Sequence, residues 1–292
     1  MGLLRRKGMY DLTDMMTQFV MNQLGFGPLG EIRMVTPGSG AFYNYMRDRV
    51  IEANFHKTVI AAEAAMVSGR NDVLLVSPDS NSLAASLTWD NNLCHMLGAG
   101  PDGCMNMRTR IGMSTTFTPM ITVSGYGNKF KNIYTMHGTA IGDLVGWLIS
   151  GERNVFENVH FGGPMNAAQG GATGYIGVHV TGSENVFRKC VFGTDTIGRD
   201  ETTPNVKLGP GTLTTFEDCL FLANLTDGDP VFVNVDNTSG YTWARFKKCQ
   251  FMAFNSNYAT AMTVALSFNG GSSAALVFDN DCQFQNLSLI HI

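Results

Sequence analysis

Residues 151–161 read G-E-R-N-V-F-E-N-V-H-F, and variants of this stretch return at a nearly constant interval along the chain. The copies align on their first aromatic residue, which gives the positions Phe130, Phe156, Phe187, Phe216, Phe246 and Phe278. Subtraction of the residue numbers gives spacings of 26, 31, 29, 30 and 32 residues. Self-similarity at a period of about 20 to 50 residues is typical of repeat proteins, in which each unit buries its apolar face against its neighbours. The sequence therefore predicts a solenoid.

Three positions of the motif predict how the repeats stack. The residues three and five after the aromatic are mostly apolar, which places them in a core with it. The residue two after it is Asn or Asp in four of six copies, and these tolerate left-handed backbone, so we expect a bend there. The residue directly after it alternates in sign through Lys131, Glu157, Arg188, Glu217, Lys247 and Asp279. Parallel strands stacked about 4.8 Å apart favour such alternation, which predicts an outward-facing charge ladder and not a catalytic site.

Each period also holds an apolar strand followed by a glycine. The expected strands are Ile121–Val123, Val145–Ile149, Ile176–Val180, Val206–Leu208, Val231–Val235 and Thr263–Leu266. The glycines, expected to turn a corner with positive φ, are Gly125, Gly151, Gly182, Gly211, Gly240 and Gly270. Two copies carry one extra residue, at 243–245 and at Asp281, and we expect β-bulges there. The first copy has Thr135 where an aromatic is expected.

The segments before the regular repeats predict two helices. Apolar residues recur at helical spacing over residues 10–24, and Gly25 would end that helix. It is either a lid over the open end of the repeat stack or a docking helix for a partner, and we favour the lid. A second helix is expected over 55–67, capped by Asn54 and ended by Gly69. Short strands are expected over 31–36, 73–76, 83–89 and 93–97.

Composition and charge limit the classes of protein to which the chain can belong. A net charge of −4 argues against a nucleic-acid-binding face, while 33 glycines and 15% charged residues suit turn-rich β structure. No apolar run approaches 18 residues, so we expect no membrane span, and the polar residues after Lys7 predict no signal peptide. We expect an N-terminal arm with a capping helix over 1–30, one elongated β-helix over 31–286, and an atypical tail over 287–292.

The cysteines and histidines predict no metal site. The cysteines are Cys94, Cys104, Cys190, Cys219, Cys249 and Cys282, with no C-x-x-C pair. The last four share one register of the repeat with Ile133 and Val159, which predicts core packing. The six histidines do not cluster, and Asp227-Gly228-Asp229 lacks the remaining ligands of a calcium loop. We therefore expect neither a metal nor another cofactor.

On its repeat motif, the unit over 55–78 and Gly98-Ala99-Gly100, the chain resembles the pectate-lyase-like right-handed parallel β-helix superfamily. More narrowly, it resembles the β-helical virion proteins of tailed phages, either tailspike-like or capsid-associated. The resemblance implies an all-β, single-stranded right-handed parallel β-helix with short N-terminal helices. It also implies a homo-oligomer, with a trimer expected, that contacts other virion proteins. A host surface polysaccharide is a further possible partner; no nucleic acid or membrane is expected.

The same coil serves enzymes and inert proteins, so catalytic motifs decide activity. Polygalacturonase-like members carry an N-x-D, an adjacent Asp pair, a G-H-G and an R-x-K in chain order. Here Gly193-Thr194-Asp195 matches the first only faintly, the Asp pair is missing, and His137-Gly138 comes too early. Arg245-Phe246-Lys247 matches the last motif but is already explained by the repeat. Tailspikes instead place acid and base in long loops, which here carry Asp195, Asp200, Glu201, Asp227 and Asp229.

Three function hypotheses follow. The leading one is a non-catalytic virion structural protein, made in the host cytoplasm and displayed on the capsid surface or tail. The second is a tailspike-type polysaccharide depolymerase, a glycoside hydrolase or lyase, with Asp195, Asp227 and Asp229 as candidate catalytic residues. The third is a carbohydrate-binding receptor protein without turnover, using Tyr241 or Trp243, which coil packing explains equally well.

The last six residues, L-S-L-I-H-I, break the repeat and resemble the translation of a sequencing-adapter remnant. On this interpretation the natural chain continues past Asn286. A terminal repeat otherwise needs a polar cap.

Overall fold

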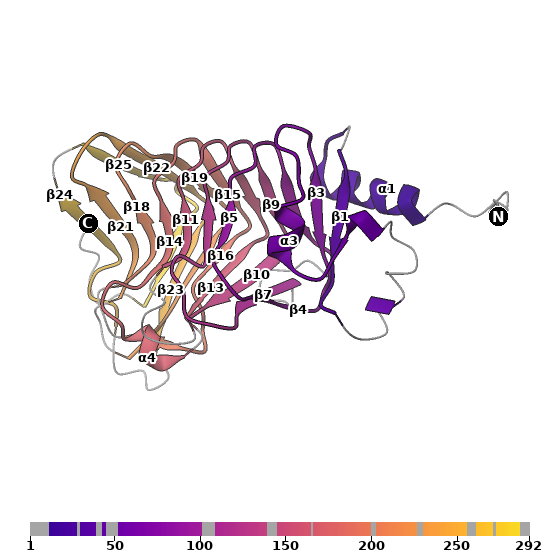
Figure 1. Ribbon diagram of the computed structural model, residues 1–292. Coiled ribbons are helices and arrows are strands. Elements are labelled where there is room, and N and C mark those ends of the chain that lie inside the picture. Colours follow the sequence, from indigo (N-terminus) through magenta and orange to yellow (C-terminus); the bar gives the residue numbers. More distant parts are fainter. Residues whose placement is uncertain are drawn as a thin grey trace, which may run out of the picture.

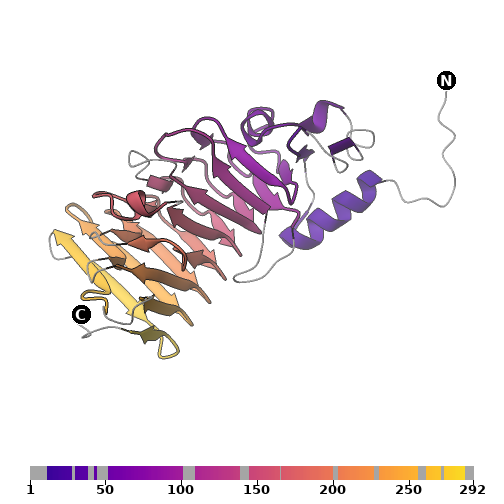
Figure 2. The ribbon, with the colours of Figure 1, turned by 90° about the horizontal axis from the view of Figure 1, so that it is seen from below.

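The computed structural model describes residues 12–27, 30–38, 43–44, 52–100, 109–138, 145–164, 166–199, 203–226, 230–255, 261–270 and 273–286. Within these ranges parallel strands form three sheets that run along one coiled stack (Figures 1 and 2). In the regular part each coil contributes one strand to each sheet. The predicted right-handed parallel β-helix is confirmed.

In the described residues the first sheet has ten strands, the second has eight on its main path and the third has seven. The first runs in the order β2 (Phe55–His56), β1 (Ile32–Val35), β3 (Val73–Val76), β6 (His95–Gly98), β9 (Lys129–Lys131), β12 (Val155–Glu157), β15 (Asn185–Arg188), β19 (Leu213–Glu217), β22 (Thr242–Lys247) and β25 (Ala274–Phe278). The second consists of β4 (Ser80–Leu83), β7 (Thr109–Met113), β10 (Ile133–His137), β13 (His160–Pro164), β16 (Val191–Phe192), β20 (Leu220–Leu225), β23 (Gln250–Phe254) and β26 (Gln283–Gln285), with β17 (Gly198–Arg199) paired beside β20. The third consists of β5 (Leu87–Trp89), β8 (Ile121–Val123), β11 (Val145–Ile149), β14 (Ile176–Val180), β18 (Pro204–Leu208), β21 (Val231–Asn237) and β24 (Leu266–Gly270).

The aromatic positions of the motif form a continuous column inside the first sheet. Phe130, Phe156, Phe187, Phe216, Phe246 and Phe278 are register partners of one another in turn. Their ring centroids are 4.7 to 5.0 Å apart and the rings are stacked nearly parallel. Burial of each ring contributes about 1.5–3 kcal/mol, and each stacked pair adds about 0.5–1.5 kcal/mol. The predicted period therefore corresponds to one coil.

A second column continues in the neighbouring sheet, five residues after the first in four copies and six residues after it in the last. It comprises Phe161, Phe192, Phe221, Phe251 and Phe284, with centroids 4.5 to 5.0 Å apart. The first copy breaks it with Thr135, and the indole of Trp147 fills the gap, because it lies 5.2 Å from Phe161. Its Nε1 donates to Thr135 Oγ1 at 2.9 Å. The missing aromatic is thus replaced by one from the third sheet.

The predicted bend between the first and second sheets is confirmed in five copies. Asn132, Asn158, Lys189, Asp218 and Lys248 all have φ between 52° and 59°. Lysine occurs twice, so the position requires the left-handed backbone and not a particular side chain. Three of the cysteines that follow are buried, and Cys282 is half-buried. Each Sγ donates to the carbonyl of the aromatic residue one coil earlier, as Cys219 does to Phe187 at 3.4 Å.

The predicted bulges are wrong. Strands β19 and β22 pair without a shift from Leu213↔Trp243 to Glu217↔Lys247, so the extra residue over 243–245 only lengthens the strand. At Asp281 the extra residue forms a turn, in which Cys282 N donates to Asp279 O at 3.0 Å. This turn replaces the one-residue bend of the other copies.

The six corner glycines have two different roles, although one was predicted. Gly211, Gly240 and Gly270 have positive φ of 79°, 92° and 108°, as expected. Gly125, Gly151 and Gly182 do not, and a Cβ on Gly151 or Gly182 would instead overlap the carbonyl oxygen of the glycine one coil earlier. Those carbonyls accept from a ladder of buried asparagine side chains. Asn154 Nδ2 donates to Gly125 O at 3.1 Å and Asn185 Nδ2 to Gly151 O at 3.0 Å.

The two N-terminal helices are placed differently from the prediction. Helix α1 (Leu12–Leu24) buries Val20 and Leu24 against Val73, Leu75 and Leu97, whose side chains point away from the interior. It therefore covers the outer face of the first sheet (Figure 2). The short α3 (Val59–Glu63) packs on β1 to β5, strands from all three sheets, and adds its own apolar face to the main core. The lid over this end of the stack is α3.

The predicted helix over 55–67 is too long. Phe55–His56 is strand β2, paired with β1. The helix begins after Thr58, whose Oγ1 accepts from Ala61 N at 3.2 Å, so the cap is Thr58 and not Asn54. The predicted strand over 83–89 is likewise two strands, β4 and β5, because the chain turns a corner between them.

Candidate functional site

Most of the long connections between strands lie at one corner of the β-helix, where the chain passes from the second sheet to the third. From β9 to β23 the bends between the first and second sheets take one or two residues, although the connection over 99–108 from β6 to β7 is ten residues long. The corners between the third and first sheets take three to five residues. From β7 onward the connections from the second to the third sheet take five to eleven residues: 114–120, 138–144, 165–175, 193–203, 226–230 and 255–265. Helix α4 (Ala167–Gly170) belongs to the third of these and projects from the stack (Figure 1). Loops on a rigid scaffold are where binding sites concentrate.

The bases of these loops rest on a buried arginine. Arg199 in β17 is only 1% exposed. Its guanidinium donates to Asn205 Oδ1, to Thr203 O and, at 2.9 Å, to Thr203 Oγ1. It also lies over the ring of Tyr175 at 5.3 Å from the centroid. Burial lowers the pKa of Arg199 from its ordinary value, and all of these partners are uncharged.

His137 at the end of β10, together with Tyr175 and Gln169 of the connection over 165–175, completes this polar cluster. The ring of Tyr175, 1% exposed, stacks on His137 at 5.1 Å with an interplanar angle of 5°. Burial raises the pKa of the Tyr175 phenol above its ordinary value. Gln169 of α4 is fully buried and packs so closely on Gly138 that a Cβ there would overlap its side chain. The cluster therefore ties three successive loops together.

Asn205 connects the cluster to the strands below it. Its Nδ2 donates to Phe192 O at 2.6 Å and to Leu222 O at 2.8 Å, carbonyls of two successive coils. His160 Nε2 lies 2.8 Å from Gly193 O at the start of the next loop. Every buried polar group satisfied in this way fixes loop geometry, because an unmade bond would cost about 1–3 kcal/mol.

A separate column of aromatic and cationic side chains lies on the outer face of the second sheet. Tyr134 stacks on His160 at 4.4 Å, and the guanidinium of Arg110 lies 5.6 Å from the Tyr134 centroid. Register pairs Tyr134 with both residues, so the three side chains follow one line across β7, β10 and β13. Arg110 and Tyr134 are partly exposed, which leaves a ring edge and a cation accessible.

Of the three candidate catalytic carboxylates, only that of Asp195 belongs to the described residues. Asp195 lies in the loop over 193–203 and is exposed, and its backbone oxygen accepts from Asn224 Nδ2 at 3.1 Å. Asp227 and Asp229 lie outside the described residues, as do Asp200 and Glu201. Their loop leaves the same corner, because Thr226 N donates to Arg199 O at 2.9 Å.

The repeat carboxylates form ion pairs across coils, as the ladder predicted. Glu157 Oε1 lies 2.6 Å from Lys131 Nζ, and Glu217 pairs with both Arg188 at 3.2 Å and Lys247 at 2.8 Å. Arg245, in the R-x-K match, lies 2.9 Å from Asp279. Tyr241 is 52% exposed and Trp243 points outward, so neither packs in the coil interior.

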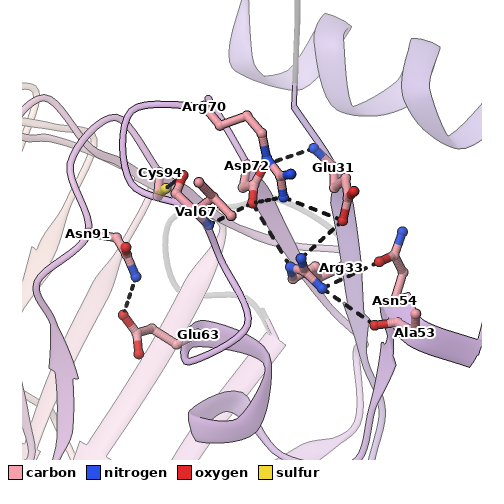
Figure 3. A network of polar contacts seen from close by, with 10 residues as sticks. All are labelled: Glu31, Arg33, Ala53, Asn54, Glu63, Val67, Arg70, Asp72, Asn91 and Cys94. Carbon is pink, nitrogen blue, oxygen red and sulfur yellow. Dashed lines mark hydrogen bonds and ion pairs between the residues drawn. The ribbon is translucent and has the colours of Figure 1, made fainter.

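A separate polar network fixes the N-terminal coils (Figure 3). The carboxylate of Asp72, fully buried, accepts from Arg70 twice at 2.7 Å and from the backbone N–H groups of Glu31 and Val67. Burial would raise the pKa of Asp72, but these donors outweigh it and hold the pKa below its ordinary value. The network joins the start of β1 to the turn between α3 and β3, so we assign it a structural role.

Glu63 of α3 lies beside this network, with one hydrogen bond from Asn91 at 2.8 Å (Figure 3). Burial raises its pKa to about 7 despite that bond. In the described ranges, no three His, Cys, Asp or Glu side chains gather as a metal site would require.

No described helix is long and apolar enough to span a membrane.

Comparison with known proteins identifies the fold. No protein-family model and no curated protein matches the chain. Among solved structures, deglycosylated pectin methylesterase from Aspergillus niger matches with a TM-score of 0.52 at 13% identity, over 90% of this chain and 86% of that one. A rhamnogalacturonan lyase matches with a TM-score of 0.50 at 13% identity, over 87% of this chain and 62% of that one. The chain shares their fold.

A third match, ORF18 of Geobacillus virus E2, has a TM-score of 0.35 at 14% identity, over 78% of this chain and 58% of that one. A TM-score this low carries no inference. At all of these identities the likeness concerns the parallel β-helix and not the activity.

Sequence reasoning missed the polar cluster. Arg199, Tyr175 and Gln169 lie in connections whose lengths differ from coil to coil, and Asn205 lies at the start of β18 directly after one of them, so no periodic signal marks the cluster as buried. The one available hint was the sequence around Arg199, a lone arginine that is followed by Thr202, Thr203 and Asn205.

Proposed function

We propose that this protein is a non-catalytic structural component of a phage virion, a rigid β-helical element of the capsid surface or tail. The observation that carries the proposal is the unbroken stacking of the motif. Each copy supplies one ring to the core column and one charge to the ladder, so the most regular residues of the chain serve the scaffold. The resemblance of the same motif to β-helical virion proteins supports a place in the particle, in contact with other virion proteins.

The test is protein identification by mass spectrometry on purified particles of the encoding phage. The chain is expected in stoichiometric amount, and antibody-gold labelling should place it on the capsid or the tail. Particles that lack the chain, with the protein found only in the lysate, would contradict a structural role.

A second candidate is recognition or cleavage of a host surface polysaccharide at the loop-bearing corner. Two observations favour it: the fold shared with a pectin methylesterase and a rhamnogalacturonan lyase, and the buried Arg199 cluster that fixes the loop bases. Incubation with host capsule should then release oligosaccharides, and Asp195→Asn, Asp227→Asn or Asp229→Asn should abolish the release. Binding that persists without release in all of these variants would indicate a receptor protein instead.

A further inference from the structure

One arginine on the outer face of the second sheet has no partner for its charge. Five of the arginines that the structure describes form ion pairs with carboxylates: Arg33, Arg70, Arg153, Arg188 and Arg245. The buried Arg199 donates to neutral acceptors instead. Within the described part of the chain, the guanidinium of Arg110 in β7 has neither an ion pair nor a hydrogen bond, and its Nε is buried without an acceptor. An ion or ligand bound in solution is one explanation for such an unsatisfied group.

The guanidinium of Arg110 is held in a fixed position although it has no acceptor. It lies over the ring of Tyr134, 5.6 Å from the ring centroid, and that ring in turn stacks on His160 with 4.4 Å between the centroids. Asp79 directly precedes β4, the strand that pairs with β7, but its carboxylate accepts from Ser77 Oγ at 3.1 Å. A cation that is already ordered loses little side-chain entropy when a ligand binds to it.

Space for a ligand lies next to Arg110 at Gly112, which faces outward from the same strand. Gly112 is partly exposed, and a Cβ there would meet no atom within 4 Å. The ring of Tyr134 does not fill this space, because it leans the other way, over Gly162, where a Cβ would overlap the ring. Ser82, the register partner of Gly112 on β4, is exposed and borders the space with its hydroxyl.

We propose that Arg110 binds an oxyanion group, a carboxylate, sulfate or phosphate, in the open space over Gly112. A guanidinium presents parallel N–H groups that match two oxygens of such a group, whereas a spherical ion such as chloride offers no second oxygen. Ser82 supplies a further donor from the neighbouring strand. The chain carries a net charge of −4, so general electrostatic attraction does not draw anions to it. The site uses neither the Arg199 cluster nor the candidate carboxylates, and it goes beyond both proposed functions.

Nuclear magnetic resonance of the protein labelled with a nitrogen isotope tests the proposal. The buried Nε–H group of Arg110 is shielded from water, so it should give a resolved signal, which is assigned by its loss in Arg110→Gln. Acetate, sulfate and inorganic phosphate are titrated separately, with the ionic strength held constant by sodium chloride. At least one of these oxyanions should move the signal to saturation, and the midpoints rank carboxylate, sulfate and phosphate. Sodium chloride alone should not move it.

Two variants locate the site, with the backbone amide signals of β4 and β7 as the measure of binding. Arg110→Gln removes the cation and should weaken binding of the preferred oxyanion at least about tenfold. Gly112→Leu keeps the cation but fills the space beside it, and should weaken binding to a similar degree. The φ of Gly112 is not positive, so the strand accommodates the leucine.

The matched control is Arg153→Gln, which also removes one guanidinium, but one that is paired with Glu184 at 2.6 Å. It should leave binding unchanged, and circular dichroism establishes that each variant is folded. The proposal is overturned if no oxyanion moves the Arg110 signal or if chloride moves it equally. Undiminished binding in Gly112→Leu, or an equal loss in Arg153→Gln, would overturn it as well.

Discussion

Glu63 places a carboxyl in the capped end of the core with a single side-chain partner, Asn91. Burial raises its pKa to about 7 in the folded protein, whereas in the unfolded chain it is near the ordinary value of 4.5. Between these two pH values the folded state holds more protons than the unfolded state. The free energy of unfolding therefore falls as the pH rises through this window, by at most about 3 kcal/mol.

The variant Glu63→Gln should remove this dependence. Its free energy of unfolding in urea should equal that of the unmodified protein near pH 5 and exceed it by about 2 kcal/mol near pH 8. Glu52→Gln is the control, because Glu52 is exposed and the same chemical change is made there, eleven residues earlier in the chain. Identical pH profiles for the unmodified protein and Glu63→Gln would show that Glu63 does not titrate in the core.

At the scale of elements, the ladder makes a prediction about β19. Glu217→Lys places a third cation between Arg188 and Lys247, which both pair with Glu217 now. We expect a loss of about 1 kcal/mol in the free energy of unfolding, smaller at high salt because exposed charges are screened.

Asp218→Lys is the matched control for this ladder variant. It makes the same charge change one residue later, at the left-handed bend where Lys189 and Lys248 already occur in other copies. Chemical denaturation at low and high salt distinguishes the two. Equal losses for both variants would mean that net charge, and not stacking, is responsible.

Helix α1 depends on its docking surface. With 13 residues it is marginal in isolation, so it is held by the contacts of Val20 and Leu24 with the outer face of the first sheet. Leu24→Ala should weaken docking by about 2–3 kcal/mol and speed amide exchange over 12–24, without comparable change in β12 to β22. Phe19→Ala, at a position that is 40% exposed on the same helix, should change exchange little. Equal effects of both variants would contradict the observed orientation.

At the scale of the whole molecule, the two ends of the core are protected unequally. Helix α3 closes the N-terminal end, whereas Phe284 and Phe278 of the last described coil are only partly buried. Each coil is stabilised by its neighbours, and among the described strands β26 pairs only with β23. Amides of β26 should therefore exchange faster than those of β3, as hydrogen-exchange mass spectrometry can measure. Equal protection would indicate that something covers the last coil in solution.

The regular coils could be predicted because every copy of the motif buries the same aromatic ring and makes the same bend. Phe156 and its equivalents, the left-handed bend and the ladder each occur about once per 30 residues, so each position was tested several times within one chain. The role of Gly151 could not be predicted, because it depends on the carbonyl of Gly125 in the coil beside it. The covering of one outer face by α1 and of the end by α3 depends on packing that helical spacing alone does not reveal.

The candidate site was harder to predict than the fold for the same reason. Arg199 is buried because loops of unequal length meet over it, and loop length carries no periodic information. The candidate carboxylates were chosen by loop length and charge alone. Asp195 is exposed, while Asp227 and Asp229 lie outside the described residues and stay predictions.

Because the ladder alternates in charge, only an even number of coils can be added or removed without placing like charges next to each other. Phe156 and Phe216 are 60 residues and two coils apart, and both are followed by glutamate. Duplication or loss of a single coil would set two like charges side by side at the junction, whereas a change of two coils, about 9.6 Å of length, preserves every neighbour. Related rods of different length should therefore differ by even numbers of coils in this part of the molecule.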